Sequence, residues 1–405
     1  MANVSSSNGL EKCPRLRFPG FDEPWKATKF GNLVHEFSDR TKEENEDLLL
    51  SAAIEGMFLN TELFGHQRGA SNKGYKKIKY GTMVLSTQNL HLGNANVNQR
   101  FEHGMVSPAY KTYDITGCSV ELIAQWIKSE AAKRFFYNAT TVGASVCRRN
   151  VEWDTLYEQP LYLPGIDEQD KIAKFLFLIS ERINKQQQFI VSLKKYKRGL
   201  LSREFGQQEN GVLNNRYVGK LKDYFHLSSG STPSSTNRAF YSGNIRWVSS
   251  GELKPKYLCE TSQHISSEAV SSCNLREYPA NTLLVAMYGL EAAGVRGTAS
   301  ILSVPATISQ ACMAIQQTGE IDIEYLYYWY IYNGQWIGIQ IAQGTKQHNL
   351  STDTLGNLRI HAPSCSKQKK VCKLLSQIDY LIEKECKKID LLSSVKRGLL
   401  QQLFI

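Results

Sequence analysis

Residues 161–205, LYLPGIDEQDKIAKFLFLISERINKQQQFIVSLKKYKRGLLSREF, decide the fold because the chain contains this stretch twice. The second copy is residues 360–404, IHAPSCSKQKKVCKLLSQIDYLIEKECKKIDLLSSVKRGLLQQLF, and the two align without a gap at an offset of 199. Residues 197–201 and 396–400 are identical, Lys-Arg-Gly-Leu-Leu. An internal repeat of this length indicates that one structural plan occurs twice.

The repeat continues upstream in a weaker form, with the small changes in offset that short loop insertions leave. We therefore predict two globular domains, each followed by a helical region. The first domain is 1–158 with helical region 159–206, and the second is 207–358 with helical region 359–405. The fold class is mixed α/β (α+β) with a pseudo-two-fold repeat. The globular parts diverge while the helices stay alike. This pattern favours a protein that performs one task twice, with two different specificities. The upstream matches are 154–156 with 353–355, Glu121 with Glu324, Trp126 with Trp329 and Thr82 with Thr282.

Each helical copy carries a heptad seam, in which apolar residues recur at alternating steps of four and three. A single helix of some 35 residues, roughly 50 Å long, cannot bury such a seam alone. We therefore predict that the two helices pair as an antiparallel coiled coil, each starting after a proline, Pro164 or Pro363. The predicted seam positions are Ile172, Leu176, Ile179, Ile183, Gln186, Ile190 and Leu193 in the first copy, and Val371, Leu375, Ile378, Ile382, Glu385, Ile389 and Leu392 in the second.

Gln186 and Glu385 interrupt the two seams at the same repeat position. In one interpretation each side chain reaches solvent or tolerates partial burial. In the other the two form a polar layer that fixes the register of the helix pair, as a buried Asn does in other coiled coils. Both interpretations stay open at this point.

The composition is that of a globular protein with a basic surplus. The 405 residues are 42% hydrophobic and 21% charged, with a formal net charge of +10, which excludes disorder along the whole chain. No apolar run approaches the ~20 residues of a membrane span, and residues 1–20 lack the apolar stretch of a signal peptide. The nine cysteines include no CxxC pair, so we expect free thiols in a reducing cytoplasm and no metal site. The surplus charge favours a polyanionic partner.

Segments rich in Gly, Ser, Asn, Gln and basic residues separate the expected strands of both globular domains. Arg and Lys side chains can bond guanine O6 and N7, and Asn and Gln can bond adenine N6 and N7, so we treat these segments as candidate DNA-reading loops. The candidates are Gln67, Arg68, Asn72, Lys73, Lys76, Lys77, Gln88, Asn89, His91, Asn94, Asn96 and Arg100 in the first domain, and Thr232, Asn237, Arg238, Lys254, Tyr288, Arg296, Lys346, Gln347 and His348 in the second.

A rigid helical spacer would hold two such modules tens of Å apart. One turn of B-DNA measures about 34–36 Å. The geometry therefore predicts two contacted DNA segments that lie roughly a turn or more apart.

Motifs for catalysis are missing from the sequence. It contains no GxxxxGK[ST] phosphate loop, no Asn-Pro-Pro-aromatic or Asp-Pro-Pro-aromatic motif and no GxSxG elbow. Glu252-Leu253-Lys254 has the ExK form found in some nucleases, but such a tripeptide is common by chance. Two rival hypotheses remain: a DNA nuclease or modification enzyme with its own active site, and a coiled-coil scaffold with no DNA role.

The arrangement resembles the specificity subunit of type I restriction-modification enzymes, over nearly the whole chain. The most specific stretches are LPGIDEQDKIAKFL (163–176) and KRGLLSREF (197–205), with KRGLLQQLF (396–404) closing the second helix. GSTPSSTNRAFYSGNIRWVSSGELK (230–254), NTLLVAMYG (281–289) and GTKQHNLSTDTLGNL (344–358) are also similar to the family. The second helical copy departs from the pattern, with Ala362-Pro363 and Lys367-Gln368 in place of Leu-Pro and Glu-Gln, which puts a partner contact there in doubt.

The resemblance implies two target-recognition domains, each reading one half of a bipartite DNA site, and a coiled coil that sets the gap between the half-sites. It also implies docking of two methyltransferase subunits, which bind S-adenosylmethionine and methylate adenine. Restriction subunits that use ATP and Mg²⁺ to translocate DNA would complete the complex. By this resemblance the chain itself binds no cofactor and is not an enzyme.

Overall fold

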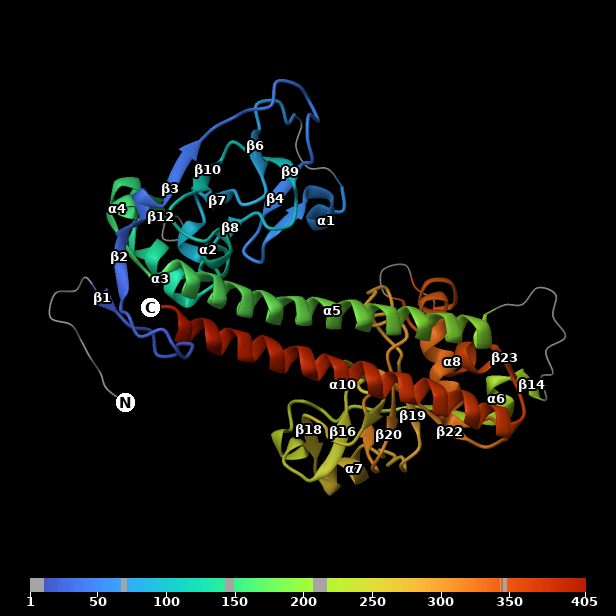
Figure 1. Ribbon diagram of the computed structural model, residues 1–405. Helices are drawn as coiled ribbons and strands as arrows, with labels where there is room; N and C mark the ends of the chain where they lie inside the picture. The colour runs from blue at the N-terminus through green and yellow to red at the C-terminus, as the bar shows by residue number, and fades with distance from the viewer. Residues whose placement is uncertain (1–10, 67–70, 143–148, 207–216, 343, 345–347) are drawn as a thin grey trace. The chain divides into compact units, whose positions relative to one another are not determined.

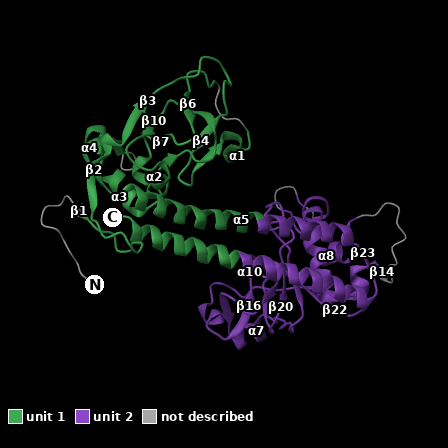
Figure 2. Ribbon diagram, in the orientation of Figure 1, with its two compact units in different colours: residues 1–188, 386–405 green, residues 189–385 purple. Residues whose placement is uncertain are grey.

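The computed structural model describes residues 11–66, 71–142, 149–206, 217–342, 344 and 348–405. The chain divides into two compact units, residues 1–188 with 386–405 (unit 1) and residues 189–385 (unit 2), which Figure 2 distinguishes by colour. In the part that is described, no helix is both long and apolar enough to span a bilayer.

Unit 1 contains a four-stranded antiparallel sheet in the order β3 (Val34–Phe37), β10 (Tyr110–Ile115), β7 (Met83–Ser86) and β8 (Ala95–Val97). The middle of β7 is completely buried, as a run of apolar residues at the centre of a sheet requires. The other elements of the unit, as far as α5, are β1 (Glu11–Lys12), β2 (Trp25–Lys29), η1 (Phe30–Asn32), β4 (Leu50–Ala52), β5 (Met57–Leu59), α1 (Asn60–Phe64), β6 (Lys76–Lys79), η2 (Leu90–Leu92), β9 (His103–Val106), α2 (Val120–Trp126), α3 (Glu130–Asn138), β11 (Thr140–Val142), β12 (Arg149–Val151), α4 (Trp153–Glu158) and β13 (Pro160–Leu163).

Unit 2 contains the corresponding sheet in the order β15 (Phe225–Ser229), β22 (Cys312–Gln317), β19 (Leu283–Ala286) and β20 (Ala299–Leu302), extended by β17 (Tyr257–Leu258). The order of the first four strands repeats that of unit 1. The remaining elements up to α10 are β14 (Tyr217–Lys220), α6 (Leu221–Tyr224), η3 (Arg238–Tyr241), β16 (Ile245–Val248), η4 (Ser250–Glu252), β18 (Gln263–Ile265), α7 (Ser267–Ser272), β21 (Thr307–Ile308), α8 (Ile323–Trp336), η5 (Ile337–Ile341), α9 (Thr352–Gly356) and β23 (Arg359–Ala362).

The repeat that the sequence predicts is therefore present in the strand order, and the fold is mixed α and β as expected. Equivalent residues also occupy equivalent places. Thr82 and Thr282 are both buried just before the central strand, and Leu90 and Leu290 are both buried after it.

Two long helices, α5 (Ile166–Phe205) and α10 (Cys365–Leu403), follow the two sheets (Figure 1). Each begins two residues after the expected proline. Every residue of the predicted seam is buried or half-buried, and the most completely buried are Ile172, Leu176 and Leu375.

The two helices run antiparallel. In unit 1 the Lys396 ammonium donates to the Ser180 hydroxyl over 2.7 Å, so the end of α10 contacts the first half of α5. In unit 2 Lys197 forms an ion pair with Asp379, so the end of α5 contacts the first half of α10. The two contacts join equivalent positions of the repeat, which is what a pseudo-two-fold chain path requires.

One glutamine fixes the start of each long helix to its own unit. Gln169 donates to the Pro164 carbonyl over 2.9 Å and accepts from the backbone N–H of Ser119, the N-cap of α2, over 2.8 Å. Gln368 makes the same two bonds, to the Pro363 carbonyl and to the N–H of Asp322, the N-cap of α8. These buried side chains are satisfied in the same way in both units, so the repeat extends to hydrogen-bond detail.

The residue before that glutamine differs between the copies, and the structure gives the reason. Glu168 is 1% exposed and accepts two bonds from the Arg17 guanidinium, at 2.9 and 2.6 Å, and one from the Trp25 indole at 3.3 Å. Lys367, its counterpart, is exposed and lies 3.9 Å from Glu204. Where unit 2 departs from the family pattern, it therefore lacks the counterpart of this internal ion pair.

The polar seam residues are unequally buried. Gln186 is half-buried, whereas Glu385 is only 5% exposed. Burial of a carboxylate in a coiled-coil seam favours the register interpretation at Glu385, because an acid that simply reaches solvent does not need a buried position. The polar layer itself stays a prediction.

Candidate nucleic-acid interface

In unit 1 the exposed candidates are Lys73, Gln88, Asn89 and Arg100, and Lys77 and His91 are half-buried. Two of the basic side chains are already paired. The Arg100 guanidinium makes two bonds to the Glu62 carboxylate, at 2.9 and 2.6 Å.

Lys77, on β6, pairs with Glu46. The Lys77 ammonium, together with backbone N–H groups, lowers the pKa of the Glu46 carboxyl to about 2. Both ion pairs lie at the surface, where such pairs contribute little to stability. Lys73, Gln88 and Asn89 are the candidates that most directly face solvent.

Four candidates of the first domain are buried instead of exposed: Asn72, Lys76, Asn94 and Asn96. Asn96 donates to the Ala53 carbonyl over 2.8 Å, and the Lys76 ammonium donates to the Tyr110 carbonyl over 2.7 Å. Burial lowers the pKa of Lys76. Buried polar groups are hydrogen-bonded as a rule, and these bonds hold the loops of the domain. Their burial argues against the direct base contacts that the sequence suggested.

In unit 2 the exposed candidates are Thr232, Asn237, Arg238, Lys254 and Tyr288. They lie around η3 and η4 and after β19, outside the regular strands. The Asn237 side chain caps η3 by accepting from the N–H of Ala239 over 3.1 Å, so its amide is partly committed to the fold.

Arg296 and His348 are half-buried and hold loops together. The Arg296 guanidinium donates to the carbonyls of Leu290 and Glu291, at 2.8 and 2.6 Å. A ring nitrogen of His348 lies 3.1 Å from the Gly338 carbonyl. The remaining candidates, Gln67, Arg68, Lys346 and Gln347, lie outside the described residues.

Lys256, two residues after the candidate Lys254, has a structural role instead of a role in DNA reading. Its ammonium pairs with Glu324 and donates to the Tyr328 hydroxyl at 2.9 Å and the Ser376 hydroxyl at 2.6 Å. Burial acts to raise the pKa of Glu324, but the bonds from Lys256 and Ser376 lower it overall. The lysine thereby ties the segment before β17 to α8 and α10, a link that the sequence alone did not reveal.

Glu252, the acidic residue of the ExK tripeptide, is also structural. Its carboxylate accepts from the backbone N–H of Ser249 at 2.8 Å and of Ser262 at 2.6 Å. Although burial acts to raise the pKa of Glu252, these bonds lower it overall. A carboxylate engaged in this way caps η4, and nothing around it in the described structure suggests hydrolytic chemistry.

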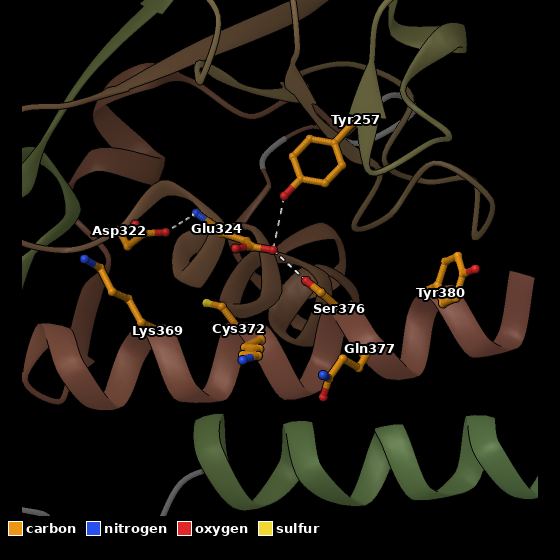
Figure 3. Close-up of a pocket in the computed structure, with 9 residues that line it drawn as sticks. Tyr257, Asp322, Glu324, Lys369, Cys372, Ser376, Gln377 and Tyr380 are labelled. Carbon is orange, nitrogen blue, oxygen red and sulfur yellow. Dashed lines mark hydrogen bonds between the residues drawn. The ribbon is translucent and has the colours of Figure 1, made fainter.

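A pocket of about 520 Å³ lies beside α10 in unit 2, with Glu324 at its centre (Figure 3). The ligand atoms of Asp322, Glu324 and Cys372 lie within 4.8 Å of one another, which is close enough for a metal ion. All three are committed elsewhere, because Asp322 caps α8, Glu324 is paired with Lys256, and burial raises the pKa of the Cys372 thiol. Before this donor set could hold a metal ion, Glu324 would have to leave Lys256 and the Cys372 thiol would have to lose its proton.

Comparison with known proteins finds a family match in the second half of the chain. Residues 216–393 match the family described as "Type I restriction modification DNA specificity domain". The chain is also 29% identical over 192 residues to the type I restriction enzyme MjaIX specificity subunit of Methanocaldococcus jannaschii, covering 46% of this chain and 43% of that protein. It is 26% identical over 155 residues to the EcoR124I/EcoR124II specificity subunit of Escherichia coli, covering 38% of each. The matches therefore span less than half of either curated relative.

Two solved structures share the fold over nearly the whole chain. The S subunit of a type I restriction-modification system from M. genitalium superposes with a TM-score of 0.59 at 14% identity, covering 97% of this chain and 99% of that one. A chain from a study of complex assembly and conformational transition of the type I R-M system gives a TM-score of 0.60 at 13% identity, covering 96% and 99%. The family match lies in the second copy of the repeat, and the strand order of that copy occurs also in the first.

Proposed function

We propose that this chain is the sequence-specific DNA-binding subunit of a type I restriction-modification complex and has no catalytic activity of its own. The observation that carries the proposal is the repeated strand order beneath two unlike sets of exposed loop residues. A duplicated scaffold with divergent loops suits two readers of different base sequence, because loops carry specificity while the scaffold positions them.

Each sheet-containing domain reads one half of a bipartite DNA site. In the first domain the exposed residues Lys73, Gln88 and Asn89 are proposed to contact DNA. In the second, these are Thr232, Arg238, Lys254 and Tyr288. Basic side chains among them meet phosphates and guanine edges, and the amides meet adenine edges.

The paired helices set the gap between the half-sites. At about 1.5 Å per residue, a 40-residue helix such as α5 measures roughly 60 Å. This length exceeds one turn of B-DNA, about 34–36 Å. We propose that removing one heptad from both helices shortens the gap that the complex accepts.

The chemistry belongs to partner subunits. Two methyltransferase subunits would dock on the helices and supply S-adenosylmethionine, and restriction subunits would supply ATP- and Mg²⁺-dependent translocation. The commitments of Glu252, Glu324 and Cys372 described above support a chain that binds no cofactor itself.

The test is a domain exchange in the assembled complex. Replacing residues 207–358 with the corresponding domain of another specificity subunit should change one half of the methylated site, mapped by methylation-sensitive sequencing, and leave the other half unaltered. Changes in both halves, or in neither, would contradict the proposal.

Two further assays separate the rival functions. The purified chain is incubated alone with DNA, Mg²⁺ and S-adenosylmethionine, and cleavage or methylation without a partner would show that it is an enzyme. Binding to duplex DNA is then measured at several salt concentrations. Lack of salt-dependent affinity, or equal affinity for a scrambled site, would favour a scaffold with no DNA role.

A further inference from the structure

In the described part of unit 1, two lysine ammonium groups lie without a carboxylate partner where the long helices meet the sheet-containing domain. Lys396, on α10, donates to the Ser180 hydroxyl over 2.7 Å. Lys128, just after α2, donates to the Ile54 carbonyl at 3.1 Å and to the side-chain oxygen of Asn96 at 2.6 Å. Neither lysine forms an ion pair within the described residues.

The two ammonium groups lie within electrostatic reach of each other. Burial, opposed by the charge of Glu55 and reinforced by that of Lys396, lowers the pKa of Lys128 to about 8. Burial also lowers the pKa of Lys396. Glu55 is exposed and, in the described structure, bonds to neither lysine. Two partly desolvated like charges repel each other, and a bound anion would relieve that repulsion.

The equivalent place in unit 2 contains a carboxylate. Lys197 takes the position of Lys396 and forms an ion pair with Asp379. Asp379 stands 199 positions after Ser180, so the repeat has a carboxylate in unit 2 where it has a hydroxyl in unit 1. The Tyr328 hydroxyl also donates to Asp379, over 2.9 Å. In unit 2 the lysine therefore has an internal counter-ion, which in unit 1 is replaced by a neutral group.

The second lysine is also particular to unit 1. The offset of 203 that aligns Glu121 with Glu324 places Ile331 opposite Lys128, and Ile331 packs against the core of unit 2. Relative to unit 2, unit 1 thus has one carboxylate fewer and one ammonium more. The three equivalent side chains sum to two positive charges in unit 1 and to zero in unit 2. This is the change that an anion-binding site requires.

The hydrogen-bond geometry assigns the two lysines different roles. An ammonium has three N–H donors, and in the described structure Lys396 uses one, on Ser180. The Ser180 hydroxyl itself donates to the Leu176 carbonyl over 2.8 Å. Lys128 makes its third contact to the Ala95 carbonyl at 3.4 Å, beyond the usual range of about 2.7–3.2 Å. Lys396 therefore has donors for a ligand, whereas Lys128 is held by the domain and supplies mainly its charge.

We propose that Lys396 and Lys128 form an anion site in unit 1 that binds one phosphate of the DNA backbone. Lys396 donates to a phosphate oxygen, and Lys128 holds a second positive charge beside it. The net charge of +10 favours a polyanion as the source of that phosphate. Because every nucleotide carries a phosphate, the contact adds affinity without reading sequence. This inference rests on the proposed function, in which a duplex that reaches both half-sites follows the helix pair.

The test installs the unit 2 carboxylate in unit 1. Ser180→Asp should pair with Lys396, as Asp379 pairs with its own lysine, and so fill the site from within. Binding of the full-length chain to duplex DNA is measured at several salt concentrations. Loss of one phosphate contact should reduce the slope of log K against log[salt] by about 0.9 and weaken binding about five- to tenfold near 0.1 M salt. The ratio of affinities for the chain's own site and a scrambled site should not change.

Three variants control for charge and folding. Lys396→Met should reduce the slope as much as Ser180→Asp does, and combining the two should add little, because both remove the same contact. Gln187→Glu adds the same charge to an exposed position about two turns further along α5, and it should weaken DNA binding less than half as much. The melting temperature of Ser180→Asp should equal or exceed that of wild type, because the new carboxylate gains a partner.

Inorganic phosphate probes the site without DNA. At equal ionic strength, phosphate should raise the melting temperature of the wild-type chain more than chloride does, since a ligand that binds only the folded state stabilises it. General salt effects of phosphate act on every variant. The difference between phosphate and chloride should therefore be smaller in Ser180→Asp and in Lys396→Met than in wild type.

Four results would overturn the inference. An unchanged salt slope in Ser180→Asp would remove the site and leave the proposed function intact. Equal losses of affinity in Ser180→Asp and Gln187→Glu would indicate general repulsion instead of a site. Stabilisation by inorganic phosphate at this site, without any change in DNA binding, would assign it to a free anion. A wild-type chain without salt-dependent DNA affinity would overturn this inference and the proposed function together.

Discussion

The two units share a plan but differ in how the chain completes them. Unit 2 is one continuous segment, residues 189–385, whereas unit 1 joins residues 1–188 to the last residues of the chain, 386–405. Leu400, Leu403 and Phe404 are buried in the core of unit 1, and the Phe404 ring packs against Trp25. The difference shows that one repeated fold can be closed either by neighbouring sequence or by the opposite end of the chain.

The units also differ in where they place their internal ion pairs. Unit 1 uses Arg17 and the buried Glu168 at the start of α5. Unit 2 has a lysine at the Glu168 position and uses Lys256 with Glu324 instead, linked through Tyr328 to Asp379. Divergence of the domains has therefore moved the charged contacts while preserving the glutamine that anchors each helix.

The largest effect that would test this comparison is loss of the C-terminal segment. A chain ending at Glu385 lacks three large core side chains of unit 1, each worth about 2–5 kcal/mol, and unit 1 should unfold. Unit 2 should stay protected in hydrogen-exchange mass spectrometry. Leu201→Ala is the matched control, because Leu201 is the unit 2 counterpart of Leu400 and both are 7% exposed. Equal loss of protection in both units after truncation would show that they do not fold separately.

A smaller effect should follow from removing the charge at the start of α5. Glu168→Gln leaves the Arg17 guanidinium without its carboxylate partner and should cost about 2–4 kcal/mol of unfolding free energy in unit 1. Lys367→Gln, at the same repeat position of α10, removes an exposed charge and should cost less than about 1 kcal/mol. Urea denaturation of the two variants measures both. Similar losses of unfolding free energy in the two variants would mean that the contribution of Glu168 to stability does not depend on its burial.

Acid should weaken unit 2 through Glu324. Its folded pKa lies below the ordinary value of 4.5, so its stabilisation is complete above the unfolded pKa and is lost as the pH falls through the folded pKa. Lys256→Met should remove about 1–3 kcal/mol near neutral pH and flatten the acid dependence below pH ~4.5. Urea denaturation between pH 3 and 7 checks this. If the unfolding free energies of wild type and variant fall in parallel as the pH is lowered, the acid effect belongs to other carboxyl groups.

The smallest effect concerns the polar seam position. Gln186→Leu with Glu385→Leu should raise the melting temperature modestly, because apolar seam residues pack better, while loosening the register of the helices. Thermal denaturation gives the first quantity, and distances between spin labels on α5 and α10 give the second. An unchanged or lower melting temperature would argue against a register role.

The long helices and the repeated plan could be predicted from the sequence because their signals are periodic. The spacing of Ile172 and Leu176, the proline before each helix and the identical Lys-Arg-Gly-Leu-Leu segments each constrain local structure directly. The antiparallel direction followed from the two-fold plan, and Lys197 and Lys396 now show it through equivalent contacts.

The candidate interface was harder to predict because burial of a polar side chain depends on distant partners. Asn96 has the composition of a base-reading residue, yet its partner is the carbonyl of Ala53, 43 positions earlier. Lys256 is likewise held by Glu324 and Ser376, which lie 68 and 120 positions later. No local sequence pattern indicates such contacts. Loop composition therefore predicts more exposed DNA-reading residues than the structure has.

Closure of unit 1 by the end of the chain has a consequence during synthesis. The backbone N–H of Leu16 bonds to the carbonyl of Gln402, so the first unit to leave the ribosome is the last to be finished. At about 5–20 residues per second, its open core waits some tens of seconds while the 197 residues of unit 2 emerge and fold. Nascent chains of this protein should therefore depend on chaperones through their first half, although that half has the longest time to fold.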